Sequence, residues 1–294
     1  MGTEDKSWQA LLQNRFYIGE EIPTSGAELA KRLTESLQML SAAQSLPGDG
    51  VQATITSPPN VELLQLNLSG FAVADDPNSL QKAKAQVSSD VSGVADRVPA
   101  QIAKMMVKAH PLIVREVPAE FDLQAEGIPF NWVIDKQGKV WFGLASESPQ
   151  DMHGEFAARI TKADLQRAAF QAASVGAAKN GLKLQDLDLE IRQVGNDFSI
   201  VGSAKLKKGF LSARADAKAA VKYDPKTMVA TVADVQVASG NPAVAMILRM
   251  ADSQIAKFRG QTFDLNQLLG GTGLQLTSLE VTASAADVRL VGKF

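Results

Sequence analysis

The sequence is poor in the side chains that most often carry chemistry. It has no cysteine and only two histidines, His110 and His153, in 294 residues. The lack of cysteine excludes disulfides, thiolate nucleophiles and cysteine-ligated zinc. Neither histidine has a metal-binding spacing such as H-x-x-x-H, and each directly precedes a proline or a glycine. We therefore expect exposed loop histidines, no metal site and no bound cofactor.

The sequence also lacks a strong excess of either charge, and it has no long apolar run. Lysine and arginine number 30 against 32 acidic residues, and the net charge of −2 leaves no basic footprint for nucleic acid. No apolar run approaches the roughly 20 residues of a membrane-spanning helix. Residues 1–21 lack the apolar core of a signal peptide. We expect a chain that is soluble as written, and the sequence leaves its compartment open between the cytoplasm and, if a signal has been removed, the cell envelope.

A repeated order of elements runs through the chain, whose 45% hydrophobic and 21% charged residues are typical of a packed globular protein. Ser25 opens a predicted helix over 25–40, and Glu28 follows at the spacing of a capping box. Thr161 and Asp164 open a second helix in the same way. Strand-like segments follow each helix. The predicted strands are 51–57, 61–74, 82–91, 182–194, 197–206, 211–223 and 228–238.

Each half continues with an apolar segment that begins at a proline, Pro99 or Pro242. Proline suits the first turn of a helix, so we predict helices over 98–109 and 241–258. A Phe-Asp-Leu tripeptide and two further strands close each half. The sequence thus predicts an α+β protein of two tandem repeats. The predicted parts are an N-terminal extension 1–21, a first repeat 22–146, a polar linker near 146–156 and a second repeat 158–294.

The strand predicted over 211–223 alternates strictly between apolar and polar residues. Its apolar positions are mostly alanine, including Ala215 and Ala217. Such alternation makes one face of a strand dry and the other wet. A long strand with small residues on its inner face can curl closely round a helix or leave a channel beside it. We therefore expect these alanines to border a cavity.

The helix predicted over 241–258 has more apolar surface than one sheet contact needs. Ile247 lies in its main stripe, and Met246 and Met250 widen the stripe on one side. Met105 and Met106 occupy the other proline-led helix. Flexible thioether side chains suit adaptable binding surfaces, although they also fill ordinary cores. The predicted lining of an apolar site is Leu33, Leu37, Met105, Met106, Ala215, Ala217, Met246, Ile247 and Met250.

Lys205, Lys207 and Lys208 flank a predicted hairpin turn, and Phe210 follows it directly. Lysines beside an exposed apolar residue suit a tip that touches anionic lipid headgroups. The alternative is a solvated turn whose lysines discourage pairing at sheet edges.

The second half resembles the LmeA-like phospholipid-binding family, which is found chiefly in actinobacteria. The resemblance covers residues 158–294 and is carried by apolar spacing over 161–173, 240–269 and 273–292. It implies a fold similar to the tubular lipid-binding (TULIP-like) proteins, in which a curved antiparallel sheet wraps a long helix and encloses an apolar groove. The implied activity is binding of a phospholipid or another acyl-chain lipid. The family brings no catalytic residues, and its members are often exported or envelope-associated.

The residues and the resemblance together predict a non-enzymatic protein that binds a phospholipid or fatty-acyl ligand, with transfer and peripheral membrane contact as possible extensions. One alternative is an interaction or scaffold protein whose repeats fill their own cores. A second is an enzyme acting on a lipid carrier through Asp75 and Asp76, which precede a proline in turn-like sequence.

Overall fold

The computed structural model describes residues 15–40, 46–73, 87–88, 93–114, 116–144, 152–179, 181–208, 211–240, 256, 259–265 and 275–294. The chain forms two compact units. Unit 1 comprises Met1–Ala158, Leu269–Thr277 and Val291–Phe294, and unit 2 comprises Arg159–Leu268 and Ser278–Leu290. Strands dominate the described residues, and α2 and α4 are the helices among them. This is the predicted α+β class.

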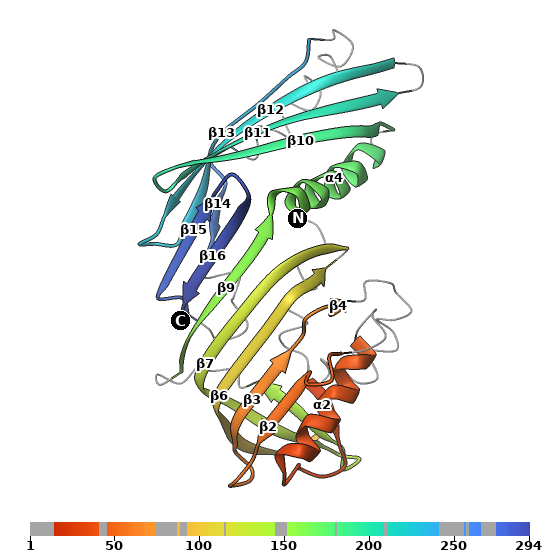
Figure 1. Ribbon diagram of the computed structural model, residues 1–294, viewed down its shortest axis with the longest axis vertical. Coiled ribbons are helices and arrows are strands. Elements are labelled where there is room, and N and C mark those ends of the chain that lie inside the picture. The colour runs from red at the N-terminus through yellow and green to blue at the C-terminus, as the bar shows by residue number, and fades with distance from the viewer. Residues whose placement is uncertain are drawn as a thin grey trace. The chain divides into compact units, whose positions relative to one another are not determined.

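Unit 1 is a mixed sheet with helix α2 (Gly26–Leu40) packed on it (Figure 1). The helix begins at its predicted capping box, where the Glu28 N–H donates to Ser25 Oγ at 3.3 Å. The main path of the sheet runs β9-β7-β6-β3-β2, and the long strands β6 and β7 are antiparallel. The strands are β1 (Arg15–Gly19), β2 (Val51–Thr54), β3 (Val61–Asn67), β4 (Ala72–Val73), β5 (Val87–Ser88), β6 (Val94–Val114), β7 (Val117–Asp135), β8 (Val140–Leu144) and the first residues of β9 (His153–Thr161).

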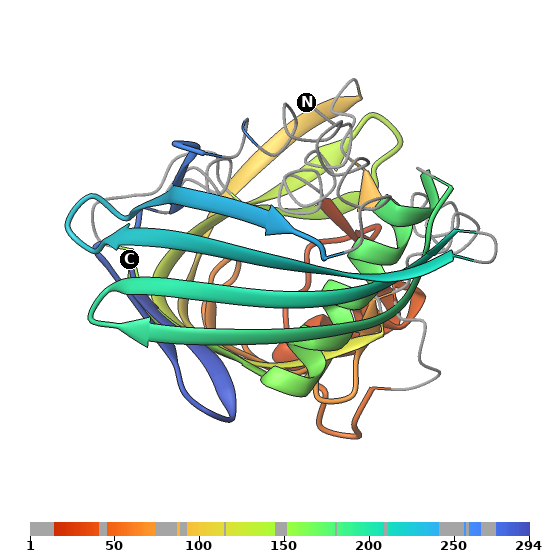
Figure 2. The same ribbon diagram turned by 90° about the horizontal axis from the view of Figure 1, so that it is seen from above.

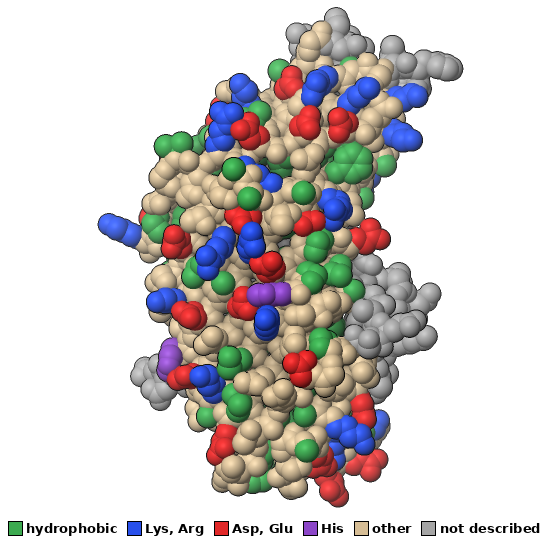
Figure 3. Space-filling model, in the orientation of Figure 1, with side chains coloured by type: hydrophobic (Ala, Val, Ile, Leu, Met, Phe, Trp, Pro, Cys, Tyr) green, Lys and Arg blue, Asp and Glu red, His purple; other side chains and the backbone are tan. Residues whose placement is uncertain are grey.

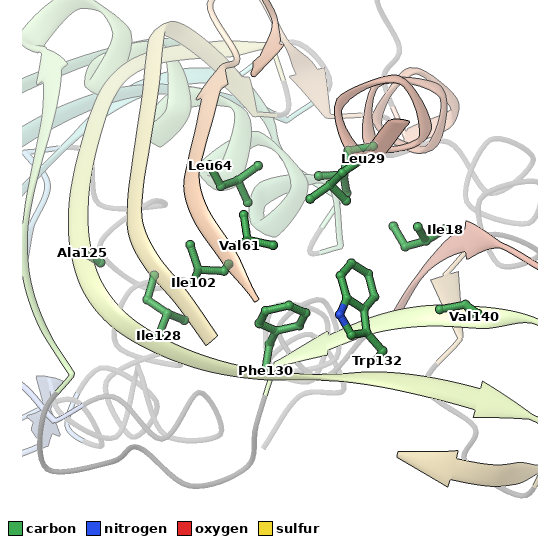
Figure 4. Packing of buried hydrophobic residues seen from close by; sticks show 11 residues of the cluster. Ile18, Leu29, Val61, Leu64, Ile102, Ala125, Ile128, Phe130, Trp132 and Val140 are labelled. Carbon is green, nitrogen blue, oxygen red and sulfur yellow. The ribbon is translucent and has the colours of Figure 1, made fainter. Parts of the chain in front are cut away.

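The core of unit 1 lies between α2 and this sheet (Figure 4). Leu29 and Leu33 of the helix are buried together with Phe130 and Trp132 of β7. The two aromatic rings have centroids 4.9 Å apart in an edge-to-face arrangement. Trp132 Nε1 donates to Pro59 O at 2.9 Å, so the one polar atom of the indole is satisfied. Unit 1 therefore fills this interior with its own side chains.

Asp135 closes the turn between β7 and β8. Its carboxylate accepts hydrogen bonds from the N–H groups of Gln137 and Lys139, at 2.8 and 2.9 Å, and from Trp141 Nε1 at 3.0 Å. Desolvation raises the pKa of this carboxyl, but the three hydrogen bonds and the charge of Lys139 outweigh it. The pKa of Asp135 therefore lies below its ordinary value.

The helix predicted over 98–109 is wrong, because these residues belong to strand β6. Strand β3 pairs with β6 only from Ile102 onward, so Pro99 lies where that side of β6 has no strand partner. The apolar spacing was misleading for a local reason. Ile102 and Met105 both contact the core although they are three residues apart on β6, so the side of the strand that faces the core changes between them. This change lies opposite Gly127 of β7, whose positive φ of 69° suits glycine. The resulting three-residue spacing imitates a helix, and one landmark of the predicted repeat is lost.

Unit 2 is an antiparallel five-stranded sheet, ordered β10-β11-β12-β13-β14, with helix α4 (Lys162–Lys179) against it (Figure 2). The helix begins as predicted, with the Asp164 N–H donating to Thr161 Oγ1 at 3.1 Å. All four strands predicted between 182 and 238 are confirmed. The five strands of this sheet are β10 (Lys183–Val194), β11 (Asp197–Lys208), β12 (Leu211–Asp224), β13 (Val229–Ala238) and β14 (Thr262–Asp264). Unit 2 also contains β15 (Ser278–Ala283) and the greater part of β16 (Asp287–Lys293), which are not part of that sheet.

Candidate functional site

One face of the unit 2 sheet is apolar, and we call it the inner face. It follows the predicted alternation of β12 and continues across the neighbouring strands in register. Helix α4 lies on this side of the sheet (Figure 2). Every inner-face residue except the buried Ala215 is only half-buried. The inner-face residues are Leu187, Leu189, Ile191, Ile200, Gly202, Ala204, Ala213, Ala215, Ala217, Ala219, Val235 and Val237.

Small residues form the centre of the inner face. Gly202 of β11 pairs with Ala217 of β12, and Ala204 pairs with Ala215. A Cβ atom placed on Gly202 would have only Asp188 O within 4 Å, at 3.7 Å. Among the described residues, no side chain therefore packs closely on this part of the sheet.

Helix α4 covers only the β10 side of the inner face. Lys162 Nζ donates to Ile191 O at 3.1 Å, and Gln166 Nε2 donates to Leu187 O at 2.8 Å. No residue of α4 is buried, and Val175 near its end is 58% exposed. A hollow of about 320 Å³ lies between the helix and β10. Its lining is Ala163, Gln166, Arg167, Phe170, Asp186 and Leu187.

The end of the inner face at Tyr223 is closed. Tyr223, Met228 and Leu279 are all buried there, and Tyr223 Oη donates to Leu279 O at 2.7 Å. Desolvation and the nearby charge of Asp224 raise the pKa of the Tyr223 hydroxyl, which therefore stays protonated and keeps this hydrogen bond at neutral pH. A ligand on the inner face could therefore not extend past this end.

The outer face of the same sheet is charged, with acidic and basic side chains mixed over β10 to β12 (Figure 3). Arg214 Nη2 lies 3.1 Å from Asp188 Oδ2. The predicted lysines lie near the end opposite Tyr223. Lys205 is in register with Arg214, and Lys207 is in register with Lys183 on its other side. Lys208 ends β11, and Phe210 lies outside the described residues.

The other predicted lining residues are distributed differently. Leu33 is 7% exposed and belongs to the packed core of unit 1, and Leu37 is half-buried on the same helix. Met105 packs against that core. Met106, the next residue of the strand, points to the opposite face, where its Sδ lies 3.6 Å from Gln65 Nε2. The two methionines therefore do not line one surface.

Ala215 and Ala217 lie side by side on the inner face, two residues apart on β12, in the positions that the alternation predicts. Several further predictions fall outside the described residues and stay predictions. They are Met246, Ile247 and Met250, the helix over 241–258 up to Ile255, and the carboxylates Asp75 and Asp76.

A second hollow, of about 350 Å³, lies in unit 1, and its lining combines charged side chains such as Lys104 and Glu155 with Ala125 and Phe294. Its lining includes His153, whose Nε2 is 3.4 Å from Glu126 Oε2. His110 Nε2 likewise lies 2.8 Å from Asp122 Oδ2. The prediction of loop histidines is wrong in that both histidines belong to strands, although both are exposed as expected. Gly154 does not end a strand but lies within β9, where Gln124 O and the Phe294 ring approach so closely that a Cβ atom would not fit.

Ser174 is a candidate functional residue that the sequence analysis did not identify. Its Oγ is buried and finds no hydrogen-bond partner within the described part of the chain. Helical spacing places it on the same side of α4 as Gln166 and Phe170, which line the hollow beside β10. A serine in an alanine-rich helix gives no signal of this kind, because burial and lack of a partner are both properties of the fold.

Within the described ranges, no three histidine or acidic side chains are arranged to hold a metal ion. None of the helices described there has the length and apolar character needed to cross a membrane. Comparison with known proteins finds no matching family model, no matching curated protein and no matching solved structure.

Proposed function

We propose that the protein binds the acyl chain of a phospholipid or another lipid on the inner face of the unit 2 sheet. Incomplete burial is the observation that carries this proposal. Among the described residues, unit 2 buries five hydrophobic side chains, while every residue of its inner face except Ala215 is only half-buried. An acyl chain lying there would lose contact with water and gain about 0.8 kcal/mol for each CH₂ group. The five are Leu184, Ala215, Tyr223, Met228 and Leu279.

The dimensions of the inner face suit one lipid tail. The inward alanines from Ala213 to Ala219 span roughly 20 Å at the usual rise of a strand. The hydrocarbon of a bilayer is about 30 Å thick, so the tails of one leaflet span about 15 Å. Because the Tyr223 end is closed, the tail would enter from the opposite end of the strands.

That opposite end is also where Lys205, Lys207 and Lys208 lie, followed by Phe210. We call this end of the strands the lysine tip, and we extend the proposal to a peripheral contact between it and anionic lipid headgroups. Cationic side chains near such a surface each contribute about 1 kcal/mol of attraction. Transfer of lipid between membranes would combine this contact with the inner-face site.

The competing function is that of an interaction protein with self-filled cores. The packed interior of unit 1 favours it, because Leu33 and its neighbours form a buried hydrophobic cluster of the protein's own side chains. In that case the inner face of unit 2 would be covered by protein.

Native mass spectrometry of the purified protein, together with solvent extraction, tests the proposal. We expect a bound lipid, or saturable binding of a fluorescent fatty acid and a fluorescent phospholipid at micromolar concentration. If neither a co-purified lipid nor saturable binding is found, the proposed function is lost and the interaction protein is favoured.

A further inference from the structure

The hydroxyl of Ser174 is a buried polar group that the protein itself does not explain. A buried serine hydroxyl on a helix ordinarily donates to the carbonyl four residues earlier or to another polar group. Within the described residues Ser174 Oγ makes no such bond. It is the single buried side-chain nitrogen or oxygen atom there that lacks a partner. Such a group makes the free protein less stable than an apolar side chain of similar size would.

The position of Ser174 connects it to the inner face. Gln166 and Phe170 line the hollow between α4 and Leu187 of β10. Ser174 follows Phe170 at the four-residue spacing that keeps side chains on one side of a helix. Lys162 and Gln166 in the first half of α4 donate hydrogen bonds to carbonyl groups of β10. Ser174 therefore has a buried hydroxyl further along the same side of α4 than Gln166 and Phe170, which line the hollow beside β10.

We propose that Ser174 is the polar anchor of the ligand, and that its hydroxyl hydrogen-bonds an oxygen atom of the bound lipid. Binding sites of this kind are mostly apolar and contain a few polar groups that fix the orientation of the ligand. The ligand class is thus an acyl-chain lipid whose carboxylate, ester carbonyl or hydroxyl oxygen reaches α4. A pure hydrocarbon would occupy the same face without this bond. The inference rests on the proposed lipid site and specifies what that site recognises.

Two fluorescent polyenes separate the two contributions. Parinaric acid has a carboxylate, whereas diphenylhexatriene is a hydrocarbon without a hydrogen-bonding atom. Titration of each into the full chain and into Ser174→Ala measures the hydroxyl alone. We expect Ser174→Ala to bind parinaric acid about 2- to 12-fold more weakly, the effect of one hydrogen bond, and to bind diphenylhexatriene unchanged. The variant should melt at the same temperature as the wild type or higher, because it loses an unpartnered hydroxyl.

Two further variants control the comparison. Ser174→Thr keeps a hydroxyl at the same position and should retain most of the affinity for parinaric acid. Ser199→Ala removes an exposed serine from the outer face of β11 and should change neither titration. The inference is overturned if Ser174→Ala weakens both probes equally or weakens neither. If the wild type binds neither probe, the proposed function fails as well, so the two failures are distinguishable.

Discussion

Filling the inner face with a large side chain should block ligand binding while leaving the sheet intact. Ala217 is the position to change, because it is half-buried at the centre of the face and pairs with Gly202 on β11. In Ala217→Trp the indole ring would cover the neighbouring glycine, where a Cβ atom has nothing closer than 3.7 Å. On the proposed site the ring would take the place of ligand methylenes, and no described residue approaches Gly202 closely enough to be displaced.

The expected loss follows from the area that the ring occupies. If the indole displaces roughly three methylene groups at about 0.8 kcal/mol each, the binding free energy falls by about 2.4 kcal/mol, or about 60-fold in affinity. The same ring should protect the apolar face from water in the free protein. We therefore expect Ala217→Trp to unfold at a denaturant concentration no lower than that of the wild type.

Titration with parinaric acid measures the affinity, and urea unfolding checks the fold. Ala220→Trp is the matched control, since Ala220 is three residues further along β12, on the outer face, and exposed. It should bind the probe as the wild type does. Equal affinity of both tryptophan variants and the wild type would refute the assignment of the ligand to the inner face.

Three further results are expected. Lys207→Glu should weaken co-sedimentation with anionic vesicles by about 2 kcal/mol, or about 30-fold. Lys222→Glu, at the other end of the outer face, is the control, and an equal loss in this variant would refute membrane contact at the lysine tip. Asp135→Asn should be less stable to urea than the wild type at neutral pH. A carboxylate whose pKa is lowered by folding stabilises the fold fully above its unfolded pKa of about 3.9, and this effect is lost as the pH falls through its folded pKa. The difference in stability between the wild type and Asp135→Asn should therefore shrink below about pH 4. A difference that stays constant with pH would contradict the reasoning. Leu33→Ala should lower the free energy of unfolding by about 2–5 kcal/mol without changing lipid affinity, and a folded variant that fails to bind would instead place the ligand beside α2.

Local patterns predicted much of unit 2 and of the helix starts. Strict alternation along 211–223 identified both the strand β12 and its apolar face, because the period of a strand is set by backbone geometry alone. The capping pairs at Ser25 and Thr161 were equally local, and both appear as hydrogen bonds to the backbone. Ala215 and Ala217 could be placed on one face for the same reason. None of these predictions needed knowledge of a distant partner.

The rest depended on partners that are remote in sequence. The segment that begins at Pro99 has the apolar spacing of a helix, yet it is a strand that pairs with β3 and β7. Its core-facing side changes opposite Gly127, which produces the helix-like spacing. Met105 and Met106 were placed together on a helix surface and lie on opposite faces of a sheet. The unpartnered hydroxyl of Ser174 is a property of its surroundings, which periodicity does not report.

The size of the inward side chains explains why the two units differ in burial. In unit 1 the inward positions of β7 carry Phe130 and Trp132, and Leu29 and Leu33 meet them from the helix, so the interior is full. In unit 2 the corresponding centre is glycine and alanine, and the nearby helix α4 is itself rich in alanine and has no buried residue. Small side chains on both surfaces cannot fill the space under a curved sheet, because a close-packed interior requires atoms in contact. Packing among the described residues therefore leaves that face only half-buried, which is the physical basis for the lipid site that we propose there.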